Sequence, residues 1–185
     1  GSGSRGPAND TVLINGGRGI LAMLEPGNTP FYTGDLVIGS GPSAGNMQDA
    51  MQFNGIIYVG SESSLDRYSL SQSRWLPSVN TGDTVSHIVN DGVNVLVATL
   101  GSGIHIIDTQ GNVLDTWDTS DGLQSDVVPR IDAEGDWVVA IHPVDGVSVF
   151  NQSSPTSAIN LNEGNSDLDS DSPTGVAIHN GVAYI

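Results

Sequence analysis

The chain has 185 residues, 37% of them hydrophobic, which is enough for one packed domain, but no run approaches the roughly 18 apolar residues of a membrane span. Its 21 acidic residues outnumber five arginines, lysine is absent, and the formal net charge of −16 excludes nucleic acid and anionic lipid as expected partners. Without cysteine, the chain has no disulfides, thiolate catalysis or cysteine-ligated zinc.

The acidity has more than one interpretation. It serves solubility, and it also fits a halophilic protein, because 1 M salt screens self-repulsion beyond about 3 Å. The absence of lysine points the same way as the acidity. Binding of divalent cations at the surface is a third interpretation, and calcium is the one cofactor that the sequence brings into consideration.

Taken in chain order, residues 1–10 are expected to be a flexible N-terminal segment or a cloning scar, since they begin GSGSR. Residues 11–185 are then the folded part. Frequent glycine, with Asp, Asn, Ser and Thr between short apolar runs, predicts many short strands joined by tight turns and almost no helix.

A repeated unit consists of an apolar segment, a glycine-containing turn and a second apolar segment. It occurs at 50–61, 87–100, 130–142 and 176–185. The turns are Asn54-Gly55, Asp91-Gly92, Glu134-Gly135 and Asn180-Gly181. We expect type I′ hairpins at these turns, because Asn-Gly and Asp-Gly supply the positive φ angles that such turns need. Successive turn glycines are 37, 43 and 46 residues apart, a period that fits a four-stranded propeller blade.

Each of the first three units is followed by a third apolar segment and by a weaker, more polar fourth segment, as expected for an outer edge strand. Lettering the strands A to D outward gives a partial blade at 11–40, blades at 47–80, 84–120 and 127–162, and a partial blade at 174–185. The predicted fold class is therefore all-β: a β-propeller with about four blades of four antiparallel strands. An open ring leaves unpaired strand edges, so we expect this chain to be part of a larger propeller, or a homo-oligomer that completes one. Trp137 is expected to pack between blades.

Residues 121–151 resemble the repeat of two-component-regulator propellers, also called ligand-binding sensor propellers. The similarity rests on Gly122, Leu123, Ser125, Val127 or Val128, Ile131, Gly135, Trp137 and Gly146, although the proline that follows Gly-Leu in that family is missing here. Kelch-like and other propellers share much of the pattern. The resemblance implies an extracytoplasmic recognition or sensor module, located outside the cell, in the periplasm or at the cell surface. It carries over no catalytic residues.

The propeller fold implies that loops D–A and B–C form one rim, which usually holds the binding site. The charged residues expected at this rim are Arg18, Glu62, Asp83, Asp121, Asp126, His142 and Asp145. Counting five residues back from each turn glycine places Ala50, His87, Arg130 and Val176 at one repeat position on strand A, where His87 and Arg130 could face a common cavity. Solvated loop residues and a wet channel wall without a ligand are the structural alternatives.

The acidic segment 166–172 resembles the start of a calcium loop. Asp167, Asp169 and Asp171 occupy the first three ligand positions, but Ser172 replaces the required glycine and Ile178 replaces the bidentate glutamate. A complete EF-hand is therefore excluded, while a weaker calcium site and a plain solvated loop stay open.

The sequence leaves three functional hypotheses open. The first is a non-catalytic module that binds a protein, peptide or glycan through its loop face. The second is a glycan-active hydrolase or lyase that uses acidic loop residues. The third is a structural segment of a surface protein. Carboxylates that converge within about 5 to 10 Å would favour a hydrolase, and scattered carboxylates would favour binding.

Overall fold

The computed structural model describes residues 11–15, 20–24 and 46–185, with the backbone alone described at 11–15, 20–24 and 154–157. Within these ranges the regular structure is β apart from one short 3-10 helix, η1 (Thr119–Asp121). Its sixteen strands form three four-stranded antiparallel sheets and two hairpins. The predicted rim residue Arg18 lies outside the described residues.

Each four-stranded sheet is a meander, in which strands that follow one another in sequence pair in space. The first sheet contains β3 (Asp49–Phe53), β4 (Ile56–Gly60), β5 (Ser64–Ser69) and β6 (Arg74–Asn80). The second contains β7 (Val85–Asn90), β8 (Val95–Thr99), β9 (Ile104–Ile107) and β10 (Val113–Trp117). The third contains β11 (Arg130–Glu134), β12 (Trp137–His142), β13 (Gly146–Asn151) and β14 (Ser154–Leu161). The hairpins pair β1 (Thr11–Asn15) with β2 (Ile20–Leu24) and β15 (Ala177–His179) with β16 (Val182–Tyr184).

The turn chemistry decides where the strands reverse. At Asn54 and Gly55 both φ angles are positive (49° and 75°), as in the predicted type I′ turn, and Asn180-Gly181 has the same pattern. The other two turns differ from the prediction. A four-residue turn from Asp91 to Asn94 joins β7 to β8, and at the third turn Gly135 is the first of two loop residues. Its positive φ of 57° at that first place is typical of a type II′ turn.

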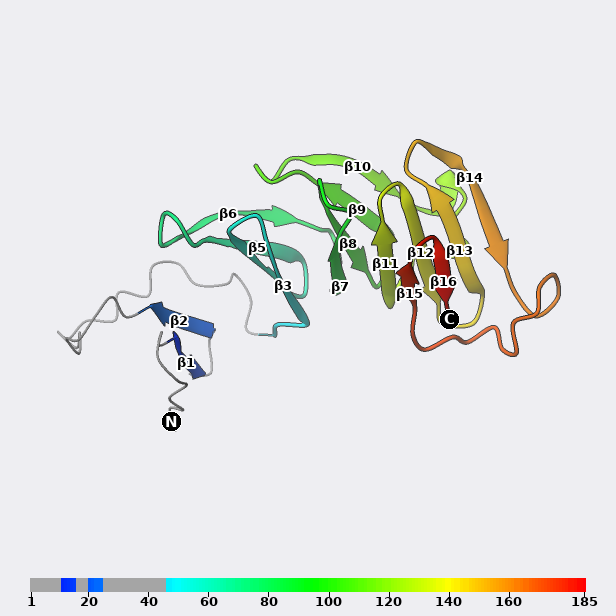
Figure 1. Cartoon of the computed structure of the whole chain (residues 1–185), viewed down its shortest axis with the longest axis horizontal. Coiled ribbons are helices and arrows are strands. Elements are labelled where there is room, and N and C mark those ends of the chain that lie inside the picture. The colour runs from blue at the N-terminus through cyan, green and yellow to red at the C-terminus, as the bar shows by residue number, and fades with distance from the viewer. Residues whose placement is uncertain (1–10, 16–19, 25–45) are drawn as a thin grey trace.

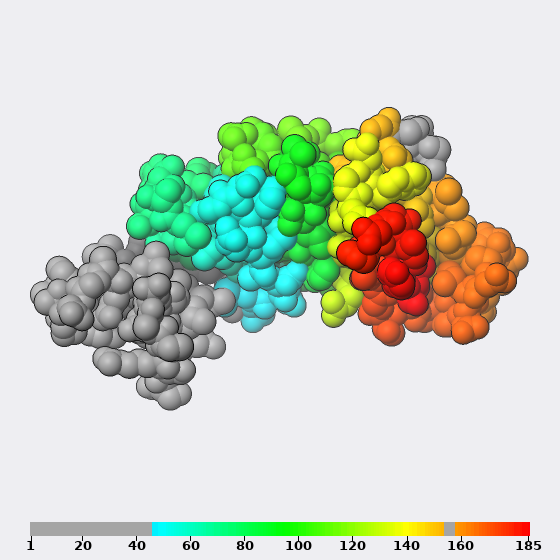
Figure 2. All heavy atoms as spheres, viewed as in Figure 1, coloured from blue at the N-terminus to red at the C-terminus, as the bar shows by residue number. Residues whose placement is uncertain are grey.

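The three sheets stand side by side in chain order (Figure 1), and their innermost strands β3, β7 and β11 contact one another in that sequence. Strand β15 of the C-terminal hairpin continues the row by contacting β11. In Figure 2 the same order is visible as a colour gradient from cyan to orange, with the red C-terminal hairpin against the yellow third sheet. Successive sheets therefore face each other rather than forming two stacked layers, which is the arrangement that a propeller requires.

Apolar side chains fill the spaces between successive sheets. One cluster joins the first and second sheets through Tyr58, Leu65 and Val85. A second joins the second and third sheets, where the rings of Trp117 and Phe150 meet edge to face with centroids 4.4 Å apart. Trp117 comes from the polar outer strand of its sheet, and it rather than Trp137 packs between sheets. Trp137 is 46% exposed, so that expectation was wrong.

Polar side chains also connect strands within each sheet, at one repeated place on the third strand. Asp66, His105 and Ser148 are buried there, and each pairs with a residue of the fourth strand. The pairs are Asp66 with Ser78, His105 Nδ1 with Thr116 Oγ1 at 2.9 Å, and Ser148 Oγ with Asn160 Oδ1 at 2.8 Å. Buried polar groups need such partners, so this row fixes the register of each outer strand.

Side chains of the inner strands link one sheet to the next. The Asp49 carboxylate accepts the Ile88 backbone N–H at 2.8 Å, and His87 Nδ1 lies 3.0 Å from the Ile131 carbonyl oxygen. Ile88 pairs with Val97, and Ile131 pairs with Ala140. An inner strand is an edge strand of its sheet, so one side of its backbone is not hydrogen-bonded within the sheet. The links between sheets use N–H and C=O groups on that side.

Candidate functional site

The loops at one end of the sheets interlock into a continuous rim. The turn between β8 and β9 lies between two loops that connect neighbouring sheets: Leu100 donates its N–H to the Thr84 carbonyl at 2.9 Å and forms an isolated bridge with Val127. Gly103 donates to the Asp126 carbonyl at 3.0 Å. Since these are backbone contacts between different loops, the rim is held in one conformation by the fold itself.

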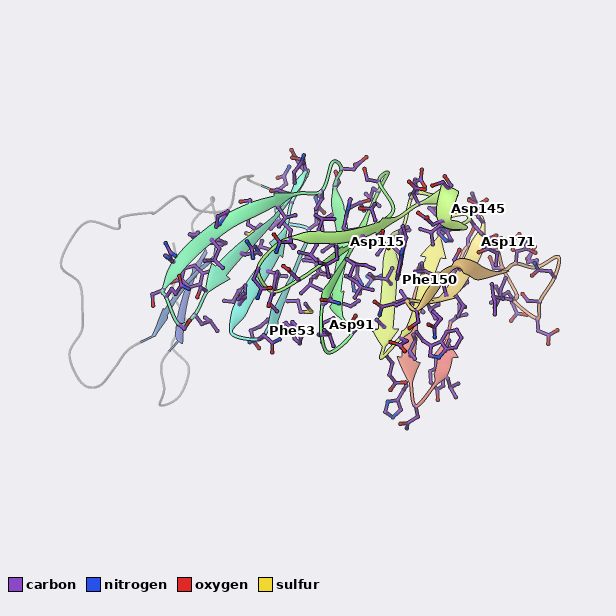
Figure 3. The ribbon with its side chains drawn as sticks, turned by 90° about the horizontal axis from the view of Figure 1, so that it is seen from above. Phe53, Asp91, Asp115, Asp145, Phe150 and Asp171 are labelled. Carbon is purple, nitrogen blue, oxygen red and sulfur yellow. The ribbon has the colours of Figure 1, made fainter. Side chains whose placement is uncertain are left out.

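Five of the predicted rim residues lie in these loops. Glu62 and Asp145 belong to turns between the second and third strands, and Asp83, Asp121 and Asp126 belong to loops between sheets. Asp145 lies at the end of the strands opposite to Asp91, which belongs to a turn at the other end (Figure 3). The sequence therefore located this group of carboxylates at one end of the molecule, with Leu100 and Val144 exposed among them.

Most rim carboxylates accept hydrogen bonds from the chain beside them. Asp83 Oδ1 accepts the Thr84 N–H at 2.6 Å, Asp121 Oδ2 accepts the Asp118 N–H at 3.2 Å, and Asp126 Oδ1 accepts the Thr119 N–H at 2.7 Å. Glu62 Oε1 accepts from the Asn46 amide at 2.7 Å. Each contact uses one carboxylate oxygen and orders the loop, which leaves a fixed negative charge at the rim.

Asp118 and Asp121 form a capping box around η1. The Asp118 side chain accepts the Ser120 N–H, and Asp121 accepts the Asp118 N–H in return. The side-chain and backbone hydrogen bonds from Ser120 lower the pKa of Asp118. A carboxyl group that serves as a general acid needs the opposite shift.

His142 is not a rim ligand, because its side chain is completely buried beneath the loops. Its Nε2 lies 2.9 Å from Ser148 Oγ and its Nδ1 lies 3.3 Å from the Val127 carbonyl oxygen. The prediction counted it among the loop residues, but β12 extends through residue 142. Burial lowers the pKa of His142, while Val127, Asp145 and Asp126 act in the opposite direction.

The inner strands carry polar residues at one register position, next to the turn that leads to the third strand. The residues there are Asp49, His87 and Arg130, opposite Gly60, Ala98 and Ile141. His87 and Arg130 therefore share a position, as the spacing suggested. Ala50 is one residue away from it, because the turn glycines do not hold equivalent places in their turns. His87 is bound to the Ile131 carbonyl oxygen and Arg130 is exposed, so the structure shows no hydrogen bond between the two.

No group of three or more His, Asp or Glu side chains in the described part of the chain is placed to hold a metal ion. Asp167 and Asp169 are exposed, and Asp171 Oδ1 accepts the Glu163 N–H at 2.6 Å. Calcium binding by Asp167, Asp169 and Asp171 therefore stays a prediction. Among the described residues, no helix has the length and apolarity needed to cross a membrane.

Comparison with known proteins settles the architecture. The extracellular domain of a B. thetaiotaomicron protein described as a one component system, BT4673, matches with a TM-score of 0.65 at 15% identity, over 98% of this chain and 27% of that domain. The extracellular domain of BT3049, described as a hybrid two component system of the same organism, matches with a TM-score of 0.62 at 14% identity, over 87% and 24%. The Neurospora crassa Pan2 WD40 domain matches with a TM-score of 0.51 at 16% identity, over 81% and 48%.

The chain is a β-propeller. Its three four-stranded sheets are blades, and the similarity in structure to these two extracellular domains agrees with the resemblance of residues 121–151 to a propeller repeat. The chain spans about a quarter of the length of the two extracellular domains that it matches. No protein-family model matches it, and no curated protein is similar to it in sequence.

Sequence reasoning missed two parts of this end of the propeller. Ser148 and Asn160, which connect His142 to the loop around Gly122, occur as ordinary polar residues within strands. Asp49 was missed because the count from the turn glycine selected its neighbour. These contacts follow from the register between neighbouring strands. The spacing of the sequence repeats varies from 37 to 46 residues, so it does not predict that register.

Proposed function

We propose that this chain belongs to a non-catalytic recognition propeller, exposed outside the cytoplasm, which binds a protein, peptide or glycan at the rim formed by its B–C and D–A loops. The observation that carries the proposal is the interlocked rim itself. Loops tied together by backbone hydrogen bonds present Glu62, Asp83, Asp126 and Asp145 together with exposed Leu100 and Val144. A preordered surface loses little conformational entropy on binding, which favours recognition.

The chemistry of this rim favours a ligand with cationic groups. Its charged residues in the described loops are carboxylates, and the chain carries a formal net charge of −16. Complementary charge accelerates the encounter with a basic partner and selects against an acidic one. The matched B. thetaiotaomicron proteins, described as one and two component systems, support a sensing role by similarity of fold.

The catalytic alternative has less support. A glycosidase requires one carboxyl group kept protonated and a second that is ionised, facing each other across the bond to be cleaved. Here the oxygens of Asp118, Asp121 and Asp126 accept backbone N–H groups, and the pKa of Asp118 moves downwards. These carboxylates serve to order the loop.

An array of immobilised peptides and glycans tests the proposal, using the labelled chain at physiological ionic strength. Binding to basic peptides should be lost when Glu62→Gln and Asp145→Asn are combined, because both changes remove charge from the rim. Asp136→Asn is the matched control, since it removes an exposed charge at the opposite end of the blade. Equal binding by the rim variant, or no binding to any member of the array, would reject a recognition role for this rim.

A further inference from the structure

The hydrogen-bond partners of the buried His142 do not fit a neutral imidazole. Asn160 Nδ2 donates to the Gly122 carbonyl oxygen at 3.0 Å, which fixes the orientation of that amide. Asn160 Oδ1 then faces Ser148 and accepts its hydroxyl hydrogen at 2.8 Å. Ser148 has no second hydrogen, so it can only accept from His142 Nε2.

The other imidazole nitrogen also faces an acceptor. His142 Nδ1 lies 3.3 Å from the Val127 carbonyl oxygen, which has no hydrogen to donate. A neutral ring carries one N–H, and it therefore satisfies Ser148 or Val127 but not both. A protonated ring donates to both of them. The hydrogen bonds at His142 thus favour proton uptake, and they oppose the effect of burial.

His105 in the preceding blade is a natural contrast. Its Nε2 lies 2.9 Å from the Thr81 carbonyl oxygen and must donate, while its Nδ1 lies 2.9 Å from the Thr116 hydroxyl, which has a hydrogen to give. A neutral ring satisfies both contacts. Burial lowers the pKa of His105, and the backbone hydrogen bond to Thr81 opposes that effect. The two histidines are buried alike, but only His142 gains a hydrogen bond on protonation.

The charged groups around His142 belong to the rim. Asp126, in the loop before β11, and Asp145, in the turn between β12 and β13, both favour its charged form. From β13 it meets Ser148, which donates in turn to Asn160 of β14, and neither of these side chains titrates.

The remaining charged neighbours are directed elsewhere. Arg130 of β11 is exposed and lies opposite Ile141. Asp171 contacts the β12–β13 turn only through its backbone carbonyl, which accepts from Gly146, while its carboxylate accepts from Glu163 N. The electrostatic coupling of His142 is therefore with two carboxylates of the proposed binding surface.

We propose that His142 is a proton-binding position beneath the rim that regulates the affinity of the rim for cationic ligands. A proton on His142 offsets the charge of Asp126 and Asp145, so protonation and binding of a cationic ligand oppose each other. Linkage makes the effect reciprocal: a bound cation lowers the proton affinity of His142 by the same factor. The link to a ligand rests on the proposed function, whereas the proton site does not.

The proton site is tested without any ligand, by following the imidazole nitrogens of the ¹⁵N-labelled chain by NMR between about pH 5 and 8. His142 should be in the Nε2–H form at the upper end and should titrate at higher pH than His105. Asp126→Asn and Asp145→Asn should each move the His142 midpoint downwards and leave that of His105 unchanged, and the Asp136→Asn control should move neither. A His142 midpoint at or below that of His105, or one unmoved by both rim variants, would overturn the proposal.

The binding arm uses a hexa-arginine peptide as the probe. Its affinity should fall about fivefold on acidification from neutral pH to about pH 5, at the lower end of ordinary coupling between sites, and His142→Gln should abolish most of that dependence. Absence of peptide binding at every pH would count against the cationic-ligand form of the proposed function, while the NMR arm would still decide the proton site. Binding with the same pH dependence in the wild type and in His142→Gln would reject the regulation.

Discussion

The contact between Trp117 and Phe150 gives the most direct test of how the blades are held together. Phe150 is 2% exposed, and its ring meets Trp117 at 89° with centroids 4.4 Å apart. Replacing Phe150 by alanine should lower the free energy of unfolding by about 4 kcal/mol, because it opens a cavity in a core shared by two blades. Roughly 1 kcal/mol of this belongs to the pairing of the rings. Phe150→Leu retains most of the volume and should cost about 1.5 kcal/mol.

The measurement is urea-induced unfolding followed by circular dichroism, at one fixed salt concentration. Trp137→Ala is the control, because Trp137 lies in the same blade and is 46% exposed. Its replacement should cost about 1 kcal/mol, in proportion to the apolar area that it buries. If Phe150→Ala costs no more than Trp137→Ala, the blades do not depend on this contact and the packing argument is refuted.

Three further predictions concern the backbone, pH and salt. Gly103→Ala should cost at least about 3 kcal/mol by the same unfolding assay, since φ is +69° and the added Cβ would lie 2.0 Å from the Trp117 carbonyl oxygen; Gly92→Ala, with φ +95° and nothing within 4 Å, should cost about 1 kcal/mol. Burial lowers the pKa values of His105 and His142, so the unfolded chain binds protons first. The stability is therefore complete above the ordinary histidine pKa of about 6.5 and should fall as the pH drops below it; thermal unfolding at pH 7.5 and pH 5.5 with equal Tm would contradict this. With a net charge of −16, the Tm should rise with NaCl concentration, and a Tm that is unchanged or lower in 1 M salt would argue against self-repulsion as a significant cost.

The turn dipeptides and short apolar segments predicted the blades, because each of these signals depends on only a few neighbouring residues. Asn-Gly strongly favours the positive φ angles of a type I′ turn, and the turn at Asn54-Gly55 formed as expected. Asp91-Gly92 carries a similar signal, yet the chain there makes a four-residue turn, because Asp91 Oδ1 accepts the N–H groups of Val93 and Asn94 instead. Side-chain capping therefore overrode the dipeptide preference.

The candidate site depended on longer-range geometry and was predicted in part. The loop topology placed Glu62, Asp83 and Asp126 at one rim, since it requires only the order of the strands. It did not show that His142 would be buried, because that depends on where β12 ends. Trp117 and Trp137 illustrate the same limit: both lie in strands, but only the neighbouring blade determines which of them is covered.

The links between inner strands bear on how such a protein can gain or lose repeats. Asp49 accepts a backbone N–H of the next inner strand, and His87 lies against a backbone carbonyl oxygen of the strand after that. In both links the following strand therefore contributes only a main-chain group. Every residue except proline supplies both kinds of main-chain group. An inserted blade presents the same backbone groups to the preceding inner strand, whatever its side chains, and must itself supply only one polar side chain for the link to the following strand. Duplication and recombination of blades during evolution would therefore need few compensating substitutions in the inner strands.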